Sequence, residues 1–191
     1  GVLALAWTTT PWTLPTNAAL AVGPEISYAV IPAGPASATP EASYLMALDT
    51  IAQYRKELGY EELEQARAAV TRVIMGSELA GIEYQRVFDY YADERFGMDN
   101  AWRILVAGYG APGEGTGIVH QAPAYGEDDQ ITCAEANIPI IISVDDAGCF
   151  LDDVSDVAGL QVFDANKPLT KLLRQSGRLF AERSYDHSYP H

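Results

Sequence analysis

The 191-residue sequence has few cysteines, few basic residues and no long apolar run. Its only cysteines, Cys133 and Cys149, do not form a C-x-x-C pair, which argues against a disulfide framework or a zinc–thiolate site. No apolar run approaches the roughly 20 residues that a membrane span requires, and the start lacks a basic signal-peptide region. We therefore expect a soluble, cytoplasmic protein with no membrane partner, in which both cysteines stay reduced.

The shortage of basic residues limits what the chain can hold by itself. Twelve Lys and Arg stand against 26 Asp and Glu, which gives a formal net charge of −14. Affinity for a nucleic-acid backbone comes largely from basic side chains that displace counterions, so this chain is unsuited to grip one alone. The basic residues near the C-terminus form either an edge that faces phosphates or a solvated helix face. They are Lys167, Lys171, Arg174, Arg178 and Arg183.

Several catalytic signatures are also missing. The sequence has no G-x-S-x-G elbow, no Walker loop and no dinucleotide fingerprint, and Cys133 falls in a predicted amphipathic helix. His187 and His191 have the i, i+4 spacing of helical zinc ligands, but Pro190 disfavours a helix there. We therefore predict no metal site and no activated protein nucleophile.

The chain is rich enough in apolar residues for one substantial core. With 48% hydrophobic and 20% charged residues, it is expected to form one domain over residues 1–191. It begins in an apolar, strand-like run without Met, and another such run lies at 179–185. Two strand-like ends suit a domain inserted into a larger protein, because the ends of inserted domains usually lie close together.

The pattern of the chain mixes strands and helices. Apolar, β-branched runs predict strands at residues 2–7, 26–31, 44–48, 103–107, 117–121, 139–144 and 160–163. Helical spacing predicts helices at residues 49–58, 126–137 and 164–175, the last with Asp164 as N-cap. Residues 61–75 favour helix in their first half and strand in their second. The mixture indicates an α+β fold, a small barrel or strongly bent sheet with helices outside.

Two stretches carry candidate chemistry. Residues 7–17 read WTTTPWTLPTN, and two tryptophans with four threonines in seven residues suit a pocket that is both shaped and polar. The alternative is a buried strand and its turn. Residues 115–129 place a strand ending in His120 before a helix that starts with Glu127, Asp128 and Asp129. Acids there are either caps favoured by the helix dipole or part of a site, and His120 is either structural or functional.

The residue types in these stretches suggest a hydrolytic site. Hydroxyls, Asn17, His120 and one Asp can hold a polar substrate while water attacks it. A carboxylate can fix an α-ammonium group through a charge-assisted hydrogen bond. Adjacent helical residues point about 100° apart, so only one of Asp128 and Asp129 faces a pocket.

Three segments resemble the editing domain of isoleucyl-tRNA synthetase, a class I aminoacyl-tRNA synthetase. They are WTTTPWTLP followed by Asn17, GTGIVH with the later Asp129, and YDHSYPH at residues 185–191. The resemblance runs from end to end and is weakest over residues 32–97. Leucyl and valyl relatives carry an Arg after two threonines, where this chain has Thr10, so the resemblance favours the isoleucyl branch over a valyl or leucyl editing domain.

The resemblance implies a β-barrel core with peripheral helices, inserted into a nucleotide-binding catalytic domain. It implies hydrolysis of the ester that joins valine to the terminal adenosine of isoleucine tRNA. The implied partners are the 3′ end of that tRNA and the rest of the synthetase chain in cis. The parent enzyme would use ATP and Mg²⁺, whereas this domain would need no metal or cofactor.

The resemblance also assigns roles to single residues. Asp129 would hold the substrate's α-ammonium group, and His120 would limit the size of its side chain. The residues that would contact the adenosine or position the water are Thr8, Thr9, Thr10 and Asn17. The residues that would line the pocket are Trp7, Trp12, Thr13 and Tyr189. Ala124, Tyr125 and Gln130 receive no role.

The implied function has a physical basis. The amino-acid pocket of an aminoacylation site rejects an amino acid that lacks one methylene by only about 1–3 kcal/mol. Isoleucyl-tRNA synthetase is itself the standard example of this figure. A second pocket that admits valine and excludes isoleucine would remove the error, and it needs rigid walls more than strong binding. The competing hypothesis is a non-catalytic module that docks the tRNA 3′ end.

Overall fold

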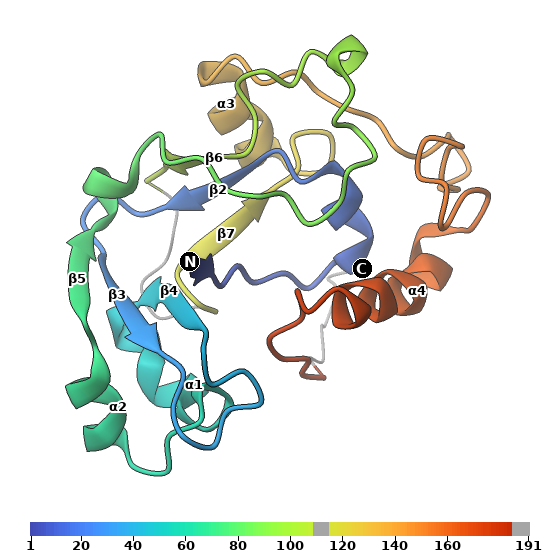
Figure 1. Ribbon diagram of the computed structural model, residues 1–191. Helices are drawn as coiled ribbons and strands as arrows, with labels where there is room; N and C mark the ends of the chain where they lie inside the picture. The colour runs from blue at the N-terminus through green and yellow to red at the C-terminus, as the bar shows by residue number, and fades with distance from the viewer. Residues whose placement is uncertain (109–114, 185–191) are drawn as a thin grey trace, which may run out of the picture.

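The computed structural model describes residues 1–108 and 115–184, which form two small β-sheets with helices packed around them (Figure 1). This arrangement confirms the predicted α+β class. The helices that flank the sheets differ in their tasks. α1 (Ile51–Leu58) and α2 (Leu63–Ala69) cover the first sheet, while α3 (Glu127–Glu135) and α4 (Val162–Gln175) flank the region where the candidate site residues gather.

The first sheet has the strand order β1-β4-β3-β5. Its strands are β1 (Val2–Ala4), β3 (Ser27–Pro32), β4 (Ser43–Ala47) and β5 (Arg72–Met75). β3 runs antiparallel to β4 and β5, and β1 runs parallel to β4. Alternate side chains of β3 and β4 bury an apolar cluster against α1, which ends where Gly59 adopts a left-handed φ of 94°. The largest members of this cluster include Ile31, Met46, Ile51, Tyr54 and Leu58.

The second sheet has the strand order β6-β2-β7 and carries the site. β2 (Ala19–Val22) lies between β6 (Arg103–Val106), to which it is parallel, and β7 (Ile118–Gln121), to which it is antiparallel. All four residues of β2 are buried. The register pairs Leu20 with His120, so the histidine stands beside the buried central strand of this sheet.

The two sheets wrap around a shared core but do not close into the barrel that the resemblance implied. The first chain segment crosses between them: the Leu5 N–H donates to the Leu45 carbonyl at 3.0 Å, and the Trp7 N–H donates to Ile118 at 3.3 Å. On the other side the ladder is interrupted by the 3-10 turn η3 (Gly76–Leu79). A Cβ on Gly76 would lie 1.8 Å from the Gly23 carbonyl oxygen, so this turn is held by a close backbone approach instead of strand pairing.

Short 3-10 helices complete the fold. They are η1 (Pro11–Thr16), η2 (Leu48–Thr50), η3 and η4 (Glu94–Phe96). η1 packs against α4, and the Trp12 N–H donates to Asn166 Oδ1 of that helix at 2.9 Å. α4 begins after Gln161, whose side chain accepts the Phe163 N–H at 2.8 Å. The N-cap is therefore Gln161, and the prediction of Asp164 as the N-cap is wrong.

Several predicted elements need correction. The strands predicted at residues 139–144 and 160–163 are wrong, because these segments make only single bridges, Val144 with Phe150 and Cys149 with Gln161. The strand-like run after residue 178 is irregular as far as residue 184, and Tyr185 lies outside the described residues. The mixed segment 61–75 does divide into a helix, α2, and a strand, β5.

The described part of the chain also bears on the predicted absences. Within residues 1–108 and 115–184, no helix is both long and apolar enough to cross a membrane. The same residues contain no group of three or more His, Cys, Asp and Glu side chains arranged to hold a metal ion. Cys133 and Cys149 are free thiols, and burial raises the pKa of Cys133 to about 12, so it remains a thiol and is no nucleophile.

Candidate functional site

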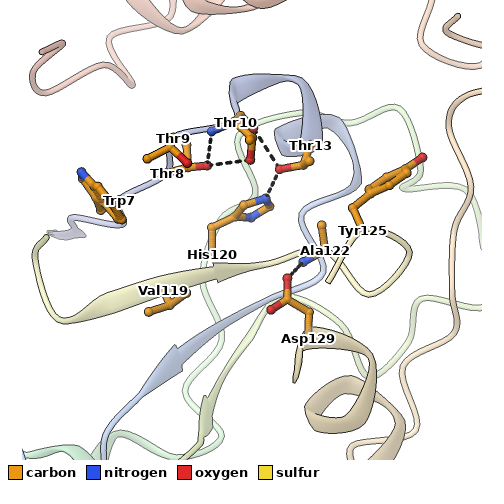
Figure 2. Close-up of a pocket in the computed structure, with 10 residues that line it drawn as sticks. All are labelled: Trp7, Thr8, Thr9, Thr10, Thr13, Val119, His120, Ala122, Tyr125 and Asp129. Carbon is orange, nitrogen blue, oxygen red and sulfur yellow. Dashed lines mark hydrogen bonds between the residues drawn. The ribbon is translucent and has the colours of Figure 1, made fainter. Parts of the chain in front are cut away.

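A hollow of about 210 Å³ opens where the chain enters η1, where β7 ends and where α3 begins (Figure 2). Seven of the predicted site residues line it, together with three that were not predicted. The predicted ones are Trp7, Thr8, Thr9, Thr10, Thr13, His120 and Asp129, and the others are Val119, Ala122 and Tyr125.

The threonine loop, residues 8–13, owes its shape to its own hydroxyls. The Thr10 N–H donates to Thr8 Oγ1 at 3.1 Å, and the Thr13 hydroxyl donates to the Thr10 carbonyl at 3.0 Å. Pro11 occupies the first turn of η1, where its fixed φ suits a helix start and its missing N–H costs nothing. The hydroxyls of Thr8 and Thr10 also lie 3.4 Å apart, so three of the four hydroxyls bond within the loop. The exposed Thr9 stands at the rim of the hollow.

His120 forms a wall of the pocket and is 8% exposed. Its Nε2 lies 2.9 Å from Thr13 Oγ1, and its Nδ1 lies 2.8 Å from Asn17 Nδ2. Burial lowers the pKa of His120 to about 4, so the ring is neutral at physiological pH. Because both nitrogens are bound within the protein, the ring presents mainly carbon surface to a ligand and is not available as a general base.

Asn17 supports His120 from behind and is absent from the pocket lining. Its Nδ2 also donates to the Ala19 carbonyl at 3.0 Å, and its Oδ1 accepts the Tyr84 hydroxyl at 2.5 Å. All polar atoms of this side chain are thus engaged inside the protein. The role predicted for Asn17 in contacting adenosine or water does not fit this placement, since the residue is only 8% exposed and its amide faces the histidine.

Trp12 and Tyr189 also differ from the other predicted residues. Trp12 does not line the hollow; its ring packs edge-on against Tyr125, with centroids 4.8 Å apart, beside the apolar cluster of α4. It therefore supports the lining from outside. Tyr189 lies outside the described residues.

Among the described residues that line the pocket, Asp129 is the one acid, and it stands at the third position of α3. Its Oδ2 accepts the Ala122 N–H at 3.0 Å, which ties the helix start to the end of β7. Burial raises its pKa and Asp128 adds to this, while the Ala122 N–H acts in the opposite direction. Asp128 and Glu127 are exposed, which confirms that only one of the two adjacent aspartates faces the pocket.

The backbone before α3 leaves room for this carboxylate. A Cβ added to Gly126 would lie 2.9 Å from Asp129 Cγ, so a glycine at the N-cap lets the side chain fold back over the helix start. There the unpaired N–H groups and the helix dipole favour a negative charge. The first helical turn thus presents one acid to the pocket and two to solvent.

Two tyrosines of the site were assigned no role from the sequence. Tyr125 lines the hollow, and its hydroxyl lies 2.8 Å from Ser143 Oγ and accepts the Ser143 N–H at 2.9 Å. Tyr84 supports Asn17 from a segment 67 positions further along the chain. Neither tyrosine belongs to a motif, so only its spatial neighbours reveal its part.

The assembled pocket has three chemically distinct sides. Hydroxyls lie on one side, a neutral imidazole forms the wall, and a carboxylate lies beyond the wall at the start of α3 (Figure 2). A ligand with a cationic end and a hydrogen-bonding end matches this set. The described residues supply no activated nucleophile here, which leaves water as the attacking group in any hydrolysis.

The sequence of the chain is similar to that of the isoleucine–tRNA ligases of several bacteria. No protein-family model matches it. It is 60% identical over 202 residues to the isoleucine–tRNA ligase of Leifsonia xyli, 45% over 191 residues to that of Tropheryma whipplei, and 46% over 193 residues to that of Corynebacterium diphtheriae. Each match covers 100% of this chain but only 17% or 18% of the relative, so the chain spans less than a fifth of their length.

Solved structures give a matching fold. The editing domain of the P. knowlesi cytosolic leucyl-tRNA synthetase matches 93% of this chain and 82% of its own, with a TM-score of 0.64 and 12% identity. The corresponding P. falciparum domain matches 91% and 77%, with a TM-score of 0.65 and 12% identity. The chain is therefore homologous over its whole length to one segment of the isoleucine–tRNA ligases, and this segment has the fold of a class I synthetase editing domain.

Proposed function

We propose that this chain is the hydrolytic proofreading domain of an isoleucyl-tRNA synthetase and deacylates valyl-tRNA(Ile). The observation that carries the proposal is the joint lining of one pocket by the threonine loop, His120 and Asp129. The match to isoleucine–tRNA ligases supports isoleucine as the amino acid of the parent enzyme. Valine, which is smaller by one methylene, is the amino acid that such a site would have to remove.

The carboxylate of Asp129 binds the α-ammonium group of the esterified amino acid. A partly buried carboxylate with a raised pKa gains most from a cation, because the cation restores the stabilisation of its charged form that burial removed. The Ala122 N–H holds one oxygen and leaves the other for the substrate. The ammonium group is thereby fixed relative to the ester carbon.

The threonine loop serves the other end of the substrate. Hydroxyls of Thr8, Thr9 and Thr10 donate to or accept from the terminal adenosine and the attacking water. The water oxygen adds to the ester carbonyl carbon, the bond to the ribose oxygen breaks, and the proton from water ends on that ribose oxygen. Free valine and uncharged tRNA are the products.

The wall of the pocket decides which amino acid enters. His120 cannot swing aside easily, because Thr13 and Asn17 hold both ring nitrogens. Isoleucine has one methylene more than valine, and a rigid wall excludes it by overlap. Exclusion by overlap can exceed the about 1–3 kcal/mol that the loss of one methylene contributes to binding.

The acidic character of the chain fits delivery of only the tRNA 3′ end. Two of the basic residues near the C-terminus are paired with acids of the same chain, Arg174 with Glu182 and Arg183 with Glu57. Contact with the tRNA phosphates therefore falls to the rest of a longer synthetase, which acts in cis and carries ATP and Mg²⁺ chemistry elsewhere. The free thiols of Cys133 and Cys149 suit the cytoplasm, where such an enzyme would work.

Deacylation of valyl-tRNA(Ile) tests the proposal, in the 191-residue chain and in the full-length synthetase that carries it. Asp129→Ala should lower kcat/KM by about 10- to 100-fold, the loss of one charge-assisted hydrogen bond to a partly shielded group. Asp128→Ala, one residue away and exposed, is the matched control and should stay within about twofold. Equal deacylation with and without Asp129 would show that the site is elsewhere. If wild-type protein fails to deacylate in either form, the segment is a docking module.

The size filter has its own test. His120→Ala removes the wall, so the variant should hydrolyse correctly charged isoleucyl-tRNA(Ile), which the wild type spares. The measurement is the ratio of the deacylation rates of the isoleucyl and valyl esters. An unchanged ratio would remove His120 from the filter while leaving the assignment of Asp129 intact.

A further inference from the structure

A chain of hydrogen bonds runs from the pocket wall to a residue far outside it. Its members are Thr13, His120, Asn17 and Tyr84. The chain ends on backbone carbonyls at two places, Thr10 and Ala19, and a carbonyl can only accept. These two fixed ends determine where each proton lies.

The direction of the bonds follows from the Ala19 end. The Asn17 amide must present its NH₂ group to the Ala19 carbonyl, so the same NH₂ also faces His120 Nδ1, which therefore accepts. The Thr13 hydroxyl gives its proton to the Thr10 carbonyl, so Thr13 Oγ1 accepts from His120 Nε2. His120 is thus neutral with its proton on Nε2.

The amide of Asn17 is held in this orientation from the opposite side. Its Oδ1 accepts the Tyr84 hydroxyl at 2.5 Å, and burial raises the pKa of Tyr84, so this hydroxyl keeps its proton. An amide rotated by 180° would set its oxygen against the Ala19 carbonyl and its NH₂ against the Tyr84 hydroxyl. Only the observed orientation gives every group a partner of the correct kind.

The backbone of Asn17 is also held, by the segment that pairs with the one carrying Tyr84. Glu83 and Arg103 form an antiparallel bridge, and the Tyr84 N–H donates to the Trp102 carbonyl at 2.9 Å. Trp102 Nε1 in turn donates to the Asn17 carbonyl at 3.0 Å, from a backbone with a φ of 58°. A positive φ at a tryptophan is unfavourable and persists only where the surroundings impose it. The paired segments therefore hold Asn17 together, Tyr84 at its side chain and Trp102 at its main chain.

We propose that Tyr84 is a positioning residue which, through Asn17, fixes the tautomer and the orientation of His120 and so sets the size discrimination of the pocket. The proposal rests on the proposed function for its kinetic consequence only, since the tautomer is a property of the protein alone. Tyr84 contacts no substrate in this arrangement. Its hydroxyl acts two side chains away from the pocket. It holds the Asn17 oxygen in place, while the Ala19 carbonyl determines that the NH₂ group is the end of the amide that faces His120.

Nuclear magnetic resonance of the ¹⁵N-labelled 191-residue chain tests the proposal directly. Only three histidines are present, and a His187→Gln/His191→Gln double variant assigns the remaining signal to His120. The wild type should show one tautomer, with the proton on Nε2, and protonation only near pH 4. Tyr84→Phe leaves the Asn17 oxygen without its donor, so the amide should hold His120 Nδ1 less firmly. Signals of both tautomers should then appear, with a pKa for His120 above the wild-type value.

The matched control is Tyr60→Phe. The Tyr60 hydroxyl also donates to a single acceptor, the Pro32 carbonyl at 2.6 Å, but it lies in the cluster against α1. This variant should leave the His120 signals unchanged. Wild-type signals in Tyr84→Phe, with near-ultraviolet circular dichroism showing a folded chain, would overturn the proposal.

A second variant covers the case in which Tyr84→Phe does not fold. Asn17→Asp replaces the NH₂ group that faces His120 by a carboxylate oxygen, which only accepts. The proton should then move to Nδ1, and the pKa of His120 should rise above its ordinary value of 6.5, because a carboxylate favours the charged ring. An Nε2 tautomer with the wild-type pKa in this variant would equally overturn the proposal.

Kinetics of the full-length synthetase give the functional arm. Tyr84→Phe should raise hydrolysis of isoleucyl-tRNA(Ile) relative to valyl-tRNA(Ile) by about tenfold, the effect of about 1.4 kcal/mol. Tyr60→Phe should leave the ratio unchanged. If the wild type hydrolyses neither ester, the proposed function fails while the tautomer result stands. If the tautomer changes and the ratio does not, Tyr84 has no part in discrimination.

Discussion

His120 and Asp129 line the same pocket, yet the protein surrounds them differently. His120 lies in the middle of a hydrogen-bond chain, is 8% exposed and has both ring nitrogens occupied. Asp129 stands at a helix start, is only partly buried and receives one backbone N–H from Ala122. Both polar atoms of the imidazole are therefore bonded within the wall, whereas the carboxylate keeps one oxygen and its negative charge for a ligand.

The difference shows how burial acts on two kinds of acid. It lowers the pKa of His120 and raises that of Asp129, so both groups move toward their uncharged forms. For the histidine the neutral form is also the one that its neighbours need. For the aspartate the charged form is the one that a substrate ammonium would need, so a cation beside the carboxylate would restore the stabilisation that burial removes.

The largest expected effect is the loss of stability in acid through His120. The unfolded chain takes up the proton near the ordinary pKa of 6.5, but the folded chain does so only near 4. Stability from this group is complete above pH 6.5 and falls as pH drops toward 4, by about 3 kcal/mol in total. Chemical denaturation at pH 7 and at pH 4 measures it as the free energy of unfolding.

A variant separates His120 from the carboxylates that also titrate in acid. His120→Gln retains a polar side chain without a titration in this range. It should be less stable than the wild type at pH 7, because the wall loses its hydrogen bonds, but it should lose less on going to pH 4. Equal losses in the two proteins would mean that His120 does not titrate as a buried neutral group.

The next effect concerns the attachment of the threonine loop to α4. The Trp12 N–H, at the start of η1, donates to Asn166 Oδ1 across 154 positions of the chain. Asn166→Ala leaves that N–H unpaired and should lower the free energy of unfolding by about 1–2 kcal/mol. Asn166→Asp keeps an acceptor in place and should recover most of the loss. Thermal denaturation of the two variants measures the difference, and equal losses would show that the bond contributes nothing.

The sequence predicted the fold well where each element was locally complete. α1 carries its own helical spacing and its Gly59 stop. β3 and β4 are short apolar runs that each include a tyrosine, which favours strands even though neither alternates strictly between buried and exposed residues. β2 was not predicted, because its four residues ALAV are all buried and show no alternation. Residues 139–144 have the β-branched composition of a strand but pair only through the single bridge of Val144, and Ile140 and Ile142 remain 46% and 61% exposed.

For the candidate site too, features within one local motif were predicted and contacts between distant segments were not. The threonine loop, His120 and Asp129 were predicted because each belongs to a short motif. The relation between them was not, since it depends on which atoms meet in space. Asn17 belongs to the motif as well, yet only the structure shows that it faces the histidine and meets Tyr84 from a distant segment. Pairing between remote positions leaves no local pattern to read.

The smallest expected effect is a change in the free energy of unfolding on Asp129→Asn, and its sign is what tests the comparison. Asp129→Asn keeps an oxygen for the Ala122 N–H but removes the charge, so it should raise the free energy of unfolding at pH 7 in the absence of ligand. Because the folded-state pKa is raised, the destabilisation by the wild-type carboxylate is complete above that pKa. It should vanish as pH falls through the ordinary carboxyl range. The gain in the variant should therefore disappear in acid, where His120 destabilises both proteins alike.

Asp128→Asn gives the matched control for this gain. Asp128 is exposed at the same helix start, so its removal should leave stability unchanged or slightly lower through the lost dipole interaction. A stabilised Asp129→Asn protein that no longer deacylates valyl-tRNA would mean that the pocket gives up stability to keep a charge ready for its substrate, a trade common at functional sites. A destabilised one would place Asp129 with His120 as part of the wall, and the contrast between the two groups would be lost.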